Sequence, residues 1–138
     1  MTALTSRHLF TLTMSLDPVL ELGDTPAGTR RVFTVANGTF TGERLRGEVL
    51  PQASSDLLLV RADGSAQQDV RLILRTDDGA LILMTYRGVR HASPEYYLRT
   101  APFFETSSSK YEWVNRIVSV ATGQRRPDGV DYDVFEIL

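Results

Sequence analysis

Three side chains of this 138-residue sequence suit proton transfer and anion binding: Asp56, Glu105 and Arg99. A carboxyl group that is partly buried has a pKa raised toward neutrality, and it can then act as a general acid or base. Asp56 directly precedes an apolar run, so it can project from the start of a strand into a cavity, although capping a turn is its alternative role. We predict that Asp56 or Glu105 moves a proton while Arg99 binds a substrate oxygen.

Further ligand contacts are predicted from arginine and aromatic residues. Fourteen arginines accompany a single lysine, and the planar guanidinium group pairs with carboxylates through two hydrogen bonds. Tyrosines and a tryptophan in the second half of the chain combine apolar surface with a few polar tips, as a small-molecule pocket requires. An ordinary aromatic core is the alternative interpretation. The predicted ligand-binding residues are Arg71, Arg75, Tyr86, Tyr97, Tyr111, Trp113 and Asn115.

Composition excludes several other functions. The absence of cysteine removes disulfides, thiolate nucleophiles and thiolate-bound zinc, and two histidines are too few for a three-ligand zinc site without carboxylates, so we expect no metal and no other cofactor. A net charge of -2 without a basic tract argues against nucleic-acid binding. No apolar run reaches the ~18 residues of a membrane-spanning helix, and the first residues do not resemble a signal peptide. We therefore expect a cytoplasmic protein with no membrane partner.

The elements that must position these side chains are strands. Apolar residues alternate with polar ones at a period of two, and no window shows a helical period. Four Asx-Gly pairs of the kind that favours tight hairpins punctuate the chain: Asn37-Gly38, Asp63-Gly64, Asp78-Gly79 and Asp128-Gly129. The predicted strands include 8–15, 31–36, 39–50, 66–76, 81–87, 96–105, 113–121 and 130–138, or about nine or ten in all when short runs are counted.

A sheet of that many antiparallel strands is expected to close. An open sheet would leave two edges free to pair with other chains, whereas a barrel removes both edges. We therefore predict an all-β, single-domain antiparallel β-barrel over residues 1–138, calycin- or lipocalin-like in general shape. Irregular stretches at 21–29, 89–95 and 104–111 are candidates for a rim over one barrel mouth. The alternation alone leaves open which face of each strand points inward.

Four motifs resemble a known family in the same order along the chain. They are GTFTGERLRGEVLP followed by Asp56, then LRTDDGALILMTYRG, PEYYLRTAPFFET and YEWVNRIVSVATG. From about Leu9 to the C-terminus the chain is similar to domain of unknown function 3237, also called UPF0311. Two departures stand out. Leu57 replaces a usual tryptophan, and the segment HASPE is shorter than in many members.

The resemblance implies a compact antiparallel β-barrel, usually a homodimer, with no general assigned activity. Together with the residues above, it leads us to expect a barrel that encloses a small organic ligand bearing a carbonyl or anionic group. A cofactor-independent isomerase, cyclase or lyase fits such a site, because positioned acids, bases and apolar walls suffice for enolisation or ring closure. The alternatives are a binding module without turnover and a structural dimer with a filled barrel.

Overall fold

Nine strands and one short helix make up the protein, and the computed structural model describes residues 2–138. The elements are β1 (Ser6–Leu16), β2 (Leu20–Thr25), β3 (Gly28–Thr41), β4 (Arg46–Val60), β5 (Ala66–Thr76), β6 (Leu81–His91), β7 (Tyr97–Glu105), the 3₁₀ helix η1 (Glu112–Arg116), β8 (Ser119–Arg126) and β9 (Gly129–Ile137). Within residues 2–138, no helix is both long and apolar enough to cross a bilayer.

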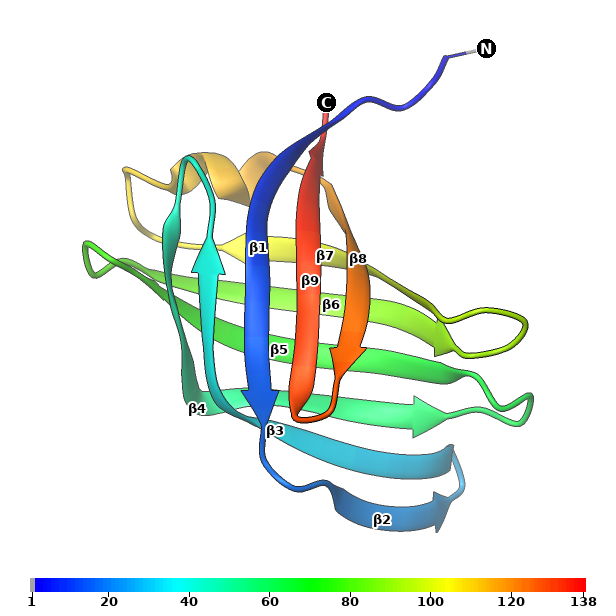
Figure 1. The fold of residues 1–138 in the computed structure, drawn as a ribbon. Helices are drawn as coiled ribbons and strands as arrows, with labels where there is room; N and C mark the ends of the chain where they lie inside the picture. Colours follow the sequence, from blue (N-terminus) through cyan, green and yellow to red (C-terminus); the bar gives the residue numbers. More distant parts are fainter. Residues whose placement is uncertain (1) are drawn as a thin grey trace.

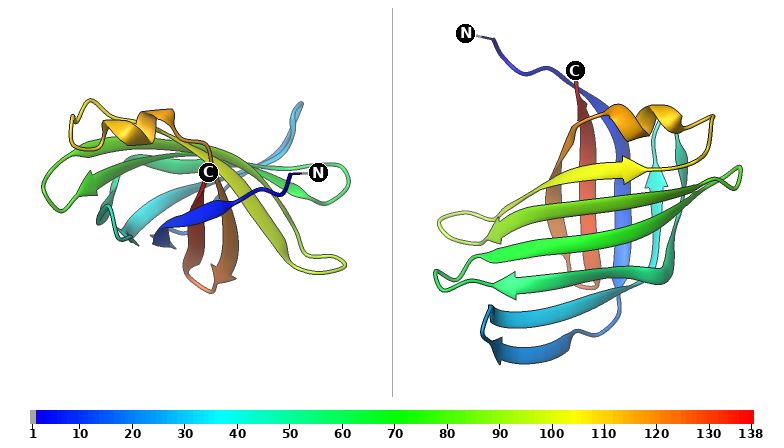
Figure 2. Two further views of the ribbon diagram at one scale, coloured as in Figure 1. Left: turned by 90° about the horizontal axis from the view of Figure 1, so that it is seen from above. Right: turned by 180° about the vertical axis from the view of Figure 1, so that it is seen from behind.

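The strands close into an antiparallel barrel. Their order is β1-β9-β8-β7-β6-β5-β4-β3-β2, and an additional pairing of β1 with β3 closes eight of them while β2 extends the sheet beyond β3. The predicted all-β barrel is confirmed. Figure 1 shows β1, β8 and β9 in one layer, crossed by β5, β6 and β7 in the other. Figure 2 shows the same crossing from behind, with β3 and β4 bending from one layer into the other.

Two β-bulges make those bends, and they reverse which residues face inward. In β3 the register shifts between Thr34 and Gly38, and in β4 it shifts between Leu50 and Ser55. Because side chains alternate along a strand, an inserted residue moves all later side chains to the opposite face. The buried residues of β4 accordingly change from Val49 to Ser54 and Leu58. Asp56 lies between the last two and therefore points into the barrel.

Several sequence-based assignments were wrong because tertiary contacts override local propensity. Asn37-Gly38 was predicted as a hairpin turn but lies inside β3, where a Cβ on Gly38 would stand 2.9 Å from the Thr13 carbonyl oxygen. Glycine is needed there for the close approach of β1. Residues 113–121 were predicted as one strand, but their first part belongs to η1. The irregular stretch predicted at 21–29 is largely the hairpin of β2 and β3.

The core fills most of the barrel interior. The ring centroid of Phe10 lies 5.4 Å from that of Phe40 and 5.9 Å from that of Phe104. Aliphatic residues from every barrel strand complete this core. The interior opens at the end where β1 stops and the β8–β9 turn lies (Figure 1).

Candidate functional site

A pocket of about 380 Å³ occupies that open end of the barrel. It lies between the two layers, with walls from β3, β4, β5 and β6 on one side and from the β8–β9 turn on the other. Its apolar surface includes Leu16, Phe33, Leu58, Tyr96 and Leu98. The volume falls within the range of small-molecule sites, which begins near ~300 Å³.

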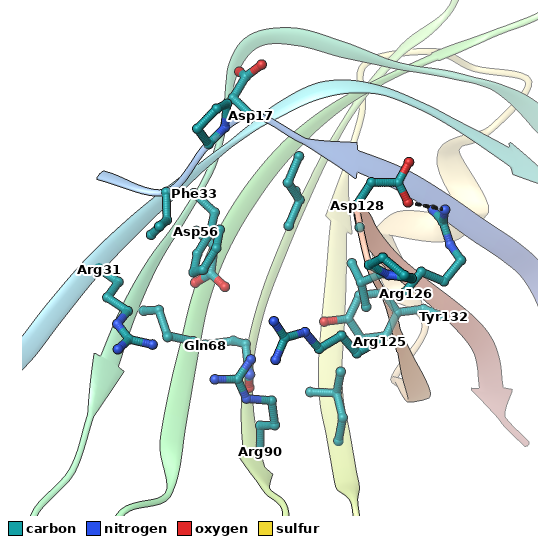
Figure 3. A pocket seen from close by; sticks show the side chains of 18 of the residues that line it. Asp17, Arg31, Phe33, Asp56, Gln68, Arg90, Arg125, Arg126, Asp128 and Tyr132 are labelled. Atoms are coloured by element: carbon teal, nitrogen blue, oxygen red, sulfur yellow. Dashed lines mark hydrogen bonds and ion pairs between the residues drawn. The ribbon is translucent and has the colours of Figure 1, made fainter. Parts of the chain in front are cut away.

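Asp56 is the carboxyl group on the inner wall of this pocket (Figure 3). The bulge that turns it inward is held by Ser54, whose hydroxyl donates to the Leu50 carbonyl at 2.5 Å and accepts the Ile73 N–H at 3.1 Å. One carboxylate oxygen of Asp56 accepts the backbone N–H of Asp69 at 3.0 Å. Two neighbouring strands thus fix the position of the carboxyl group.

The surroundings of Asp56 raise its pKa from 3.8 to about 6, chiefly because burial disfavours the charged form. The Asp69 N–H and the positive charge of Arg90 oppose this change without cancelling it. Near neutral pH the group therefore exchanges its proton easily, which is the property that a general acid or base needs.

Two buried polar side chains also line this pocket, Gln68 from β5 and Tyr132 from β9 on the opposite side. Tyr132 is 4% exposed, and burial raises the pKa of its hydroxyl far above neutrality, so it remains a proton donor. Its ring packs edge-on against Tyr86, with centroids 5.5 Å apart. Gln68 is 3% exposed, and its amide oxygen has no hydrogen-bond partner among residues 2–138.

The predicted catalytic residues are not brought together. Glu105 is exposed at the end of β7 and does not line the pocket. Arg99 is exposed on the outer face of the same strand, where its guanidinium lies 4.7 Å from the ring centroid of Tyr97 and donates to the Leu98 carbonyl at 2.9 Å. Only Asp56 of the predicted catalytic group lies in the pocket.

The predicted ligand-binding residues are similarly dispersed. Arg71 and Arg75 lie exposed on the outer face of β5, where Arg75 forms an ion pair with Glu48. Tyr97 is exposed at the start of β7 and stacks on His91, with ring centroids 4.9 Å apart. Tyr86 is buried behind Tyr132 and so supports the pocket from the core.

The remaining three predicted residues stabilise the opposite end of the barrel. The Tyr111 hydroxyl donates to Asp78 at 2.9 Å, and Trp113 lies 4.2 Å beneath the Arg44 guanidinium. The Asn115 side chain bonds both backbone groups of Thr106, at 2.8 and 3.0 Å. These contacts tie η1 to the barrel.

Sequence reasoning missed most of the residues that surround Asp56. Gln68, Arg90, Arg125 and Tyr132 line the pocket but come from four different strands. The available signal was positional: Arg90 lies in the predicted rim at 89–95, and Arg125 stands beside the Asp128-Gly129 turn. Arg90 and Arg125 line the same pocket only because the barrel closes, and the sequence alone does not show this.

Comparison with known proteins identifies relatives over the whole chain. The family model described as "Protein of unknown function (DUF3237)" matches residues 4–137. A UPF0311 protein of Clostridium acetobutylicum is 32% identical over 94% of this chain and 92% of its own length. The crystal structure of a β-barrel-like protein from Acinetobacter baumannii is 34% identical, with a TM-score of 0.93 over 99% of this chain and 98% of that one.

A fungal relative carries a named activity. The hydroalkoxylation enzyme phnH of Penicillium herquei is 30% identical over 83% of this chain and 70% of its own length. The structure of an enzyme from the same fungus is 26% identical, with a TM-score of 0.82 over 99% of this chain and 96% of that one. On the family match and the bacterial relatives, this chain belongs to the DUF3237 family, also named UPF0311.

Proposed function

We propose that this protein is a cofactor-independent proton-transfer enzyme that closes a ring by adding a hydroxyl group across a carbon–carbon double bond. The observation that carries the proposal is the Asp56 carboxyl group, with its pKa near 6, on the wall of a pocket large enough for a small organic molecule. The name of the fungal relative supports this reaction class, because hydroalkoxylation is the addition of an O–H bond to an alkene.

A single carboxyl group can carry out both proton transfers of this reaction. Asp56 in its acid form gives its proton to one alkene carbon while the substrate hydroxyl oxygen bonds to the other carbon. The hydroxyl proton then returns to the Asp56 carboxylate, so the enzyme ends in its starting state. No electrons leave or enter the substrate, and the step therefore needs no oxidant or reductant. Tyr132, held protonated, is placed to donate a hydrogen bond to a carbonyl or phenolic oxygen.

Deuterium incorporation tests the proposal. A phenol with an ortho-alkenyl chain is incubated with the enzyme in D₂O, and NMR locates the new C–D bond in the cyclised product. Asp56→Asn keeps the oxygen that accepts the Asp69 N–H but removes the transferable proton, so we expect a loss of ~10²–10⁴-fold in kcat/KM. Glu43→Gln, at an exposed position outside the pocket, is the matched control and should keep full activity.

The pH profile separates cyclisation from the related reactions. A general acid at Asp56 gives a kcat/KM that falls as pH rises through about 6, because the protonated form is lost. Enolisation by an isomerase or lyase would need the carboxylate as base, and the rate would then rise over the same interval. An Asp56→Asn enzyme that cyclises the probe at the wild-type rate contradicts the proposal. Tight probe binding by the wild type without turnover supports a non-catalytic binding module instead.

A further inference from the structure

Beyond the pocket that contains Asp56 lies a second, outer compartment of about 670 Å³. The two spaces adjoin, and we take the outer, more open one as the entrance to the inner one. They share the residues Arg31, Arg90, Tyr96, Arg125, Arg126 and Pro127. His91 also lines the outer compartment. No Asp or Glu of the described chain is among the lining residues of this entrance.

Two of the entrance arginines are not engaged in an ion pair within the described chain. Arg31 pairs with Glu21 at 3.2 Å, and Arg126 pairs with Asp128 and Asp131 at 3.0 and 2.8 Å. Arg90 and Arg125, in contrast, form no ion pair with any other side chain in residues 2–138. Figure 3 shows both guanidinium groups directed into the pocket space near Gln68. A guanidinium group that faces a pocket and is not paired with a carboxylate is available to bind an anionic ligand.

The position of these arginines relative to Asp56 adds a second argument. Arg90 is close enough to lower the pKa of both Asp56 and Tyr132. Neutralising its charge with a bound anion would therefore favour the protonated form of Asp56. Substrate binding and formation of the general acid would then be coupled, since each favours the other.

We propose that the substrate carries a carboxylate, which Arg90 and Arg125 bind at the entrance while the reacting double bond lies beside Asp56. This inference rests on the proposed function for the role of Asp56 and deepens it by naming the charged group of the substrate. The carboxylate determines which molecules enter and how they are oriented, and Asp56 performs the chemistry. Two guanidinium groups from β6 and β8 form the binding site, and neither belongs to the catalytic step.

Binding of a matched pair of probes tests the charge preference without turnover. 4-Hydroxybenzoate and 4-hydroxybenzamide share a ring and a hydroxyl group but differ in charge at neutral pH. Titration calorimetry on the full chain should show the acid binding at least roughly tenfold tighter, the size of one charge-assisted hydrogen bond. Added salt should reduce this preference, because mobile ions screen exposed charges.

Variants show which residues cause the preference for the acid over the amide. Arg90→Gln combined with Arg125→Gln should bind acid and amide equally, whereas Arg116→Gln, in η1 at the other end of the barrel, should keep the wild-type ratio. Asp56→Asn should keep or increase the ratio, because it removes a negative charge from the pocket. Equal binding of the two probes by the wild type overturns the proposal, as does failure to bind the acid up to its solubility limit.

The two proposals fail in different ways. A charge preference that depends on Arg90 and Arg125, found together with an Asp56→Asn variant of undiminished activity, removes the proposed reaction but leaves the anion site. An Asp56→Asn variant without activity, found together with equal binding of acid and amide by the wild type, supports the proposed reaction but removes the anion site.

Discussion

Replacing Asp56 with Asn should stabilise the protein at high pH and not at low pH. A folded-state pKa of about 6 against 3.8 in the unfolded chain means that the folded protein binds this proton more tightly. Both states are protonated below the unfolded pKa, so the group has no effect there. Between the two values the unfolded chain ionises first, and stability is lost as the pH rises. Above the folded pKa the full cost of the buried charge is present.

The size of the effect follows from that difference. A difference of this size corresponds to ~3 kcal/mol, since each pKa unit is worth about 1.4 kcal/mol. With an unfolding entropy of ~2.1 cal/mol/K per residue, this is a change of about 10 °C in Tm for a domain of this length. Thermal unfolding of the wild type and of Asp56→Asn, followed by circular dichroism at about pH 3 and about pH 8, measures this change.

The comparison between the two pH values isolates the charge. Any packing difference between Asp and Asn changes both measurements equally, so the difference in ΔΔG between them reports the ionisation alone. Glu43→Gln, an exposed carboxylate replaced in the same way, should show no comparable pH dependence. Parallel stability curves for the wild type and Asp56→Asn would refute the claim that Asp56 is ionised at a cost, and with it the argument for a proton carrier at neutral pH.

Three further predictions concern the barrel and the earlier site assignment. Glu136→Gln should destabilise the fold by ~1–3 kcal/mol at neutral pH. Burial favours the neutral form of this carboxyl, but hydrogen bonds from Arg44 at 2.6 Å and Arg7 at 3.0 Å outweigh that effect and lower its pKa. Urea unfolding should show the stability difference between wild type and variant disappearing as the pH falls through the lowered pKa. Gly129→Ala should destabilise by at least ~2 kcal/mol, because its Cβ would stand 1.8 Å from the Met14 carbonyl oxygen, and an unchanged denaturation midpoint would contradict this steric argument. Glu105→Gln and Arg99→Gln test the sequence-based catalytic assignment in the deuterium assay, where we expect near wild-type kcat/KM because both side chains are exposed outside the pocket.

The sequence by itself determined the kind of fold and one member of the candidate site. Period-two alternation and three Asp-Gly turns predict antiparallel strands, because both are local consequences of backbone geometry. Closure follows from the need to pair the sheet edges. Asp56 could be singled out because it directly precedes an apolar run, so that it can project from the start of a strand into a cavity.

Only the tertiary structure decided which residues surround Asp56. The bulges in β3 and β4 reverse the inward face within a single strand, so alternation read along the sequence assigns side chains to the wrong side after each one. Arg71, Arg75 and Arg99 lie at alternate positions of their strands and were predicted to line the pocket, yet their side chains are exposed on the outer face. Arg90 and Arg125 lie on different strands and meet only because the barrel closes around the pocket. Local sequence determines strand and turn, whereas inward direction and proximity depend on register and closure, which are set by contacts between distant parts of the chain.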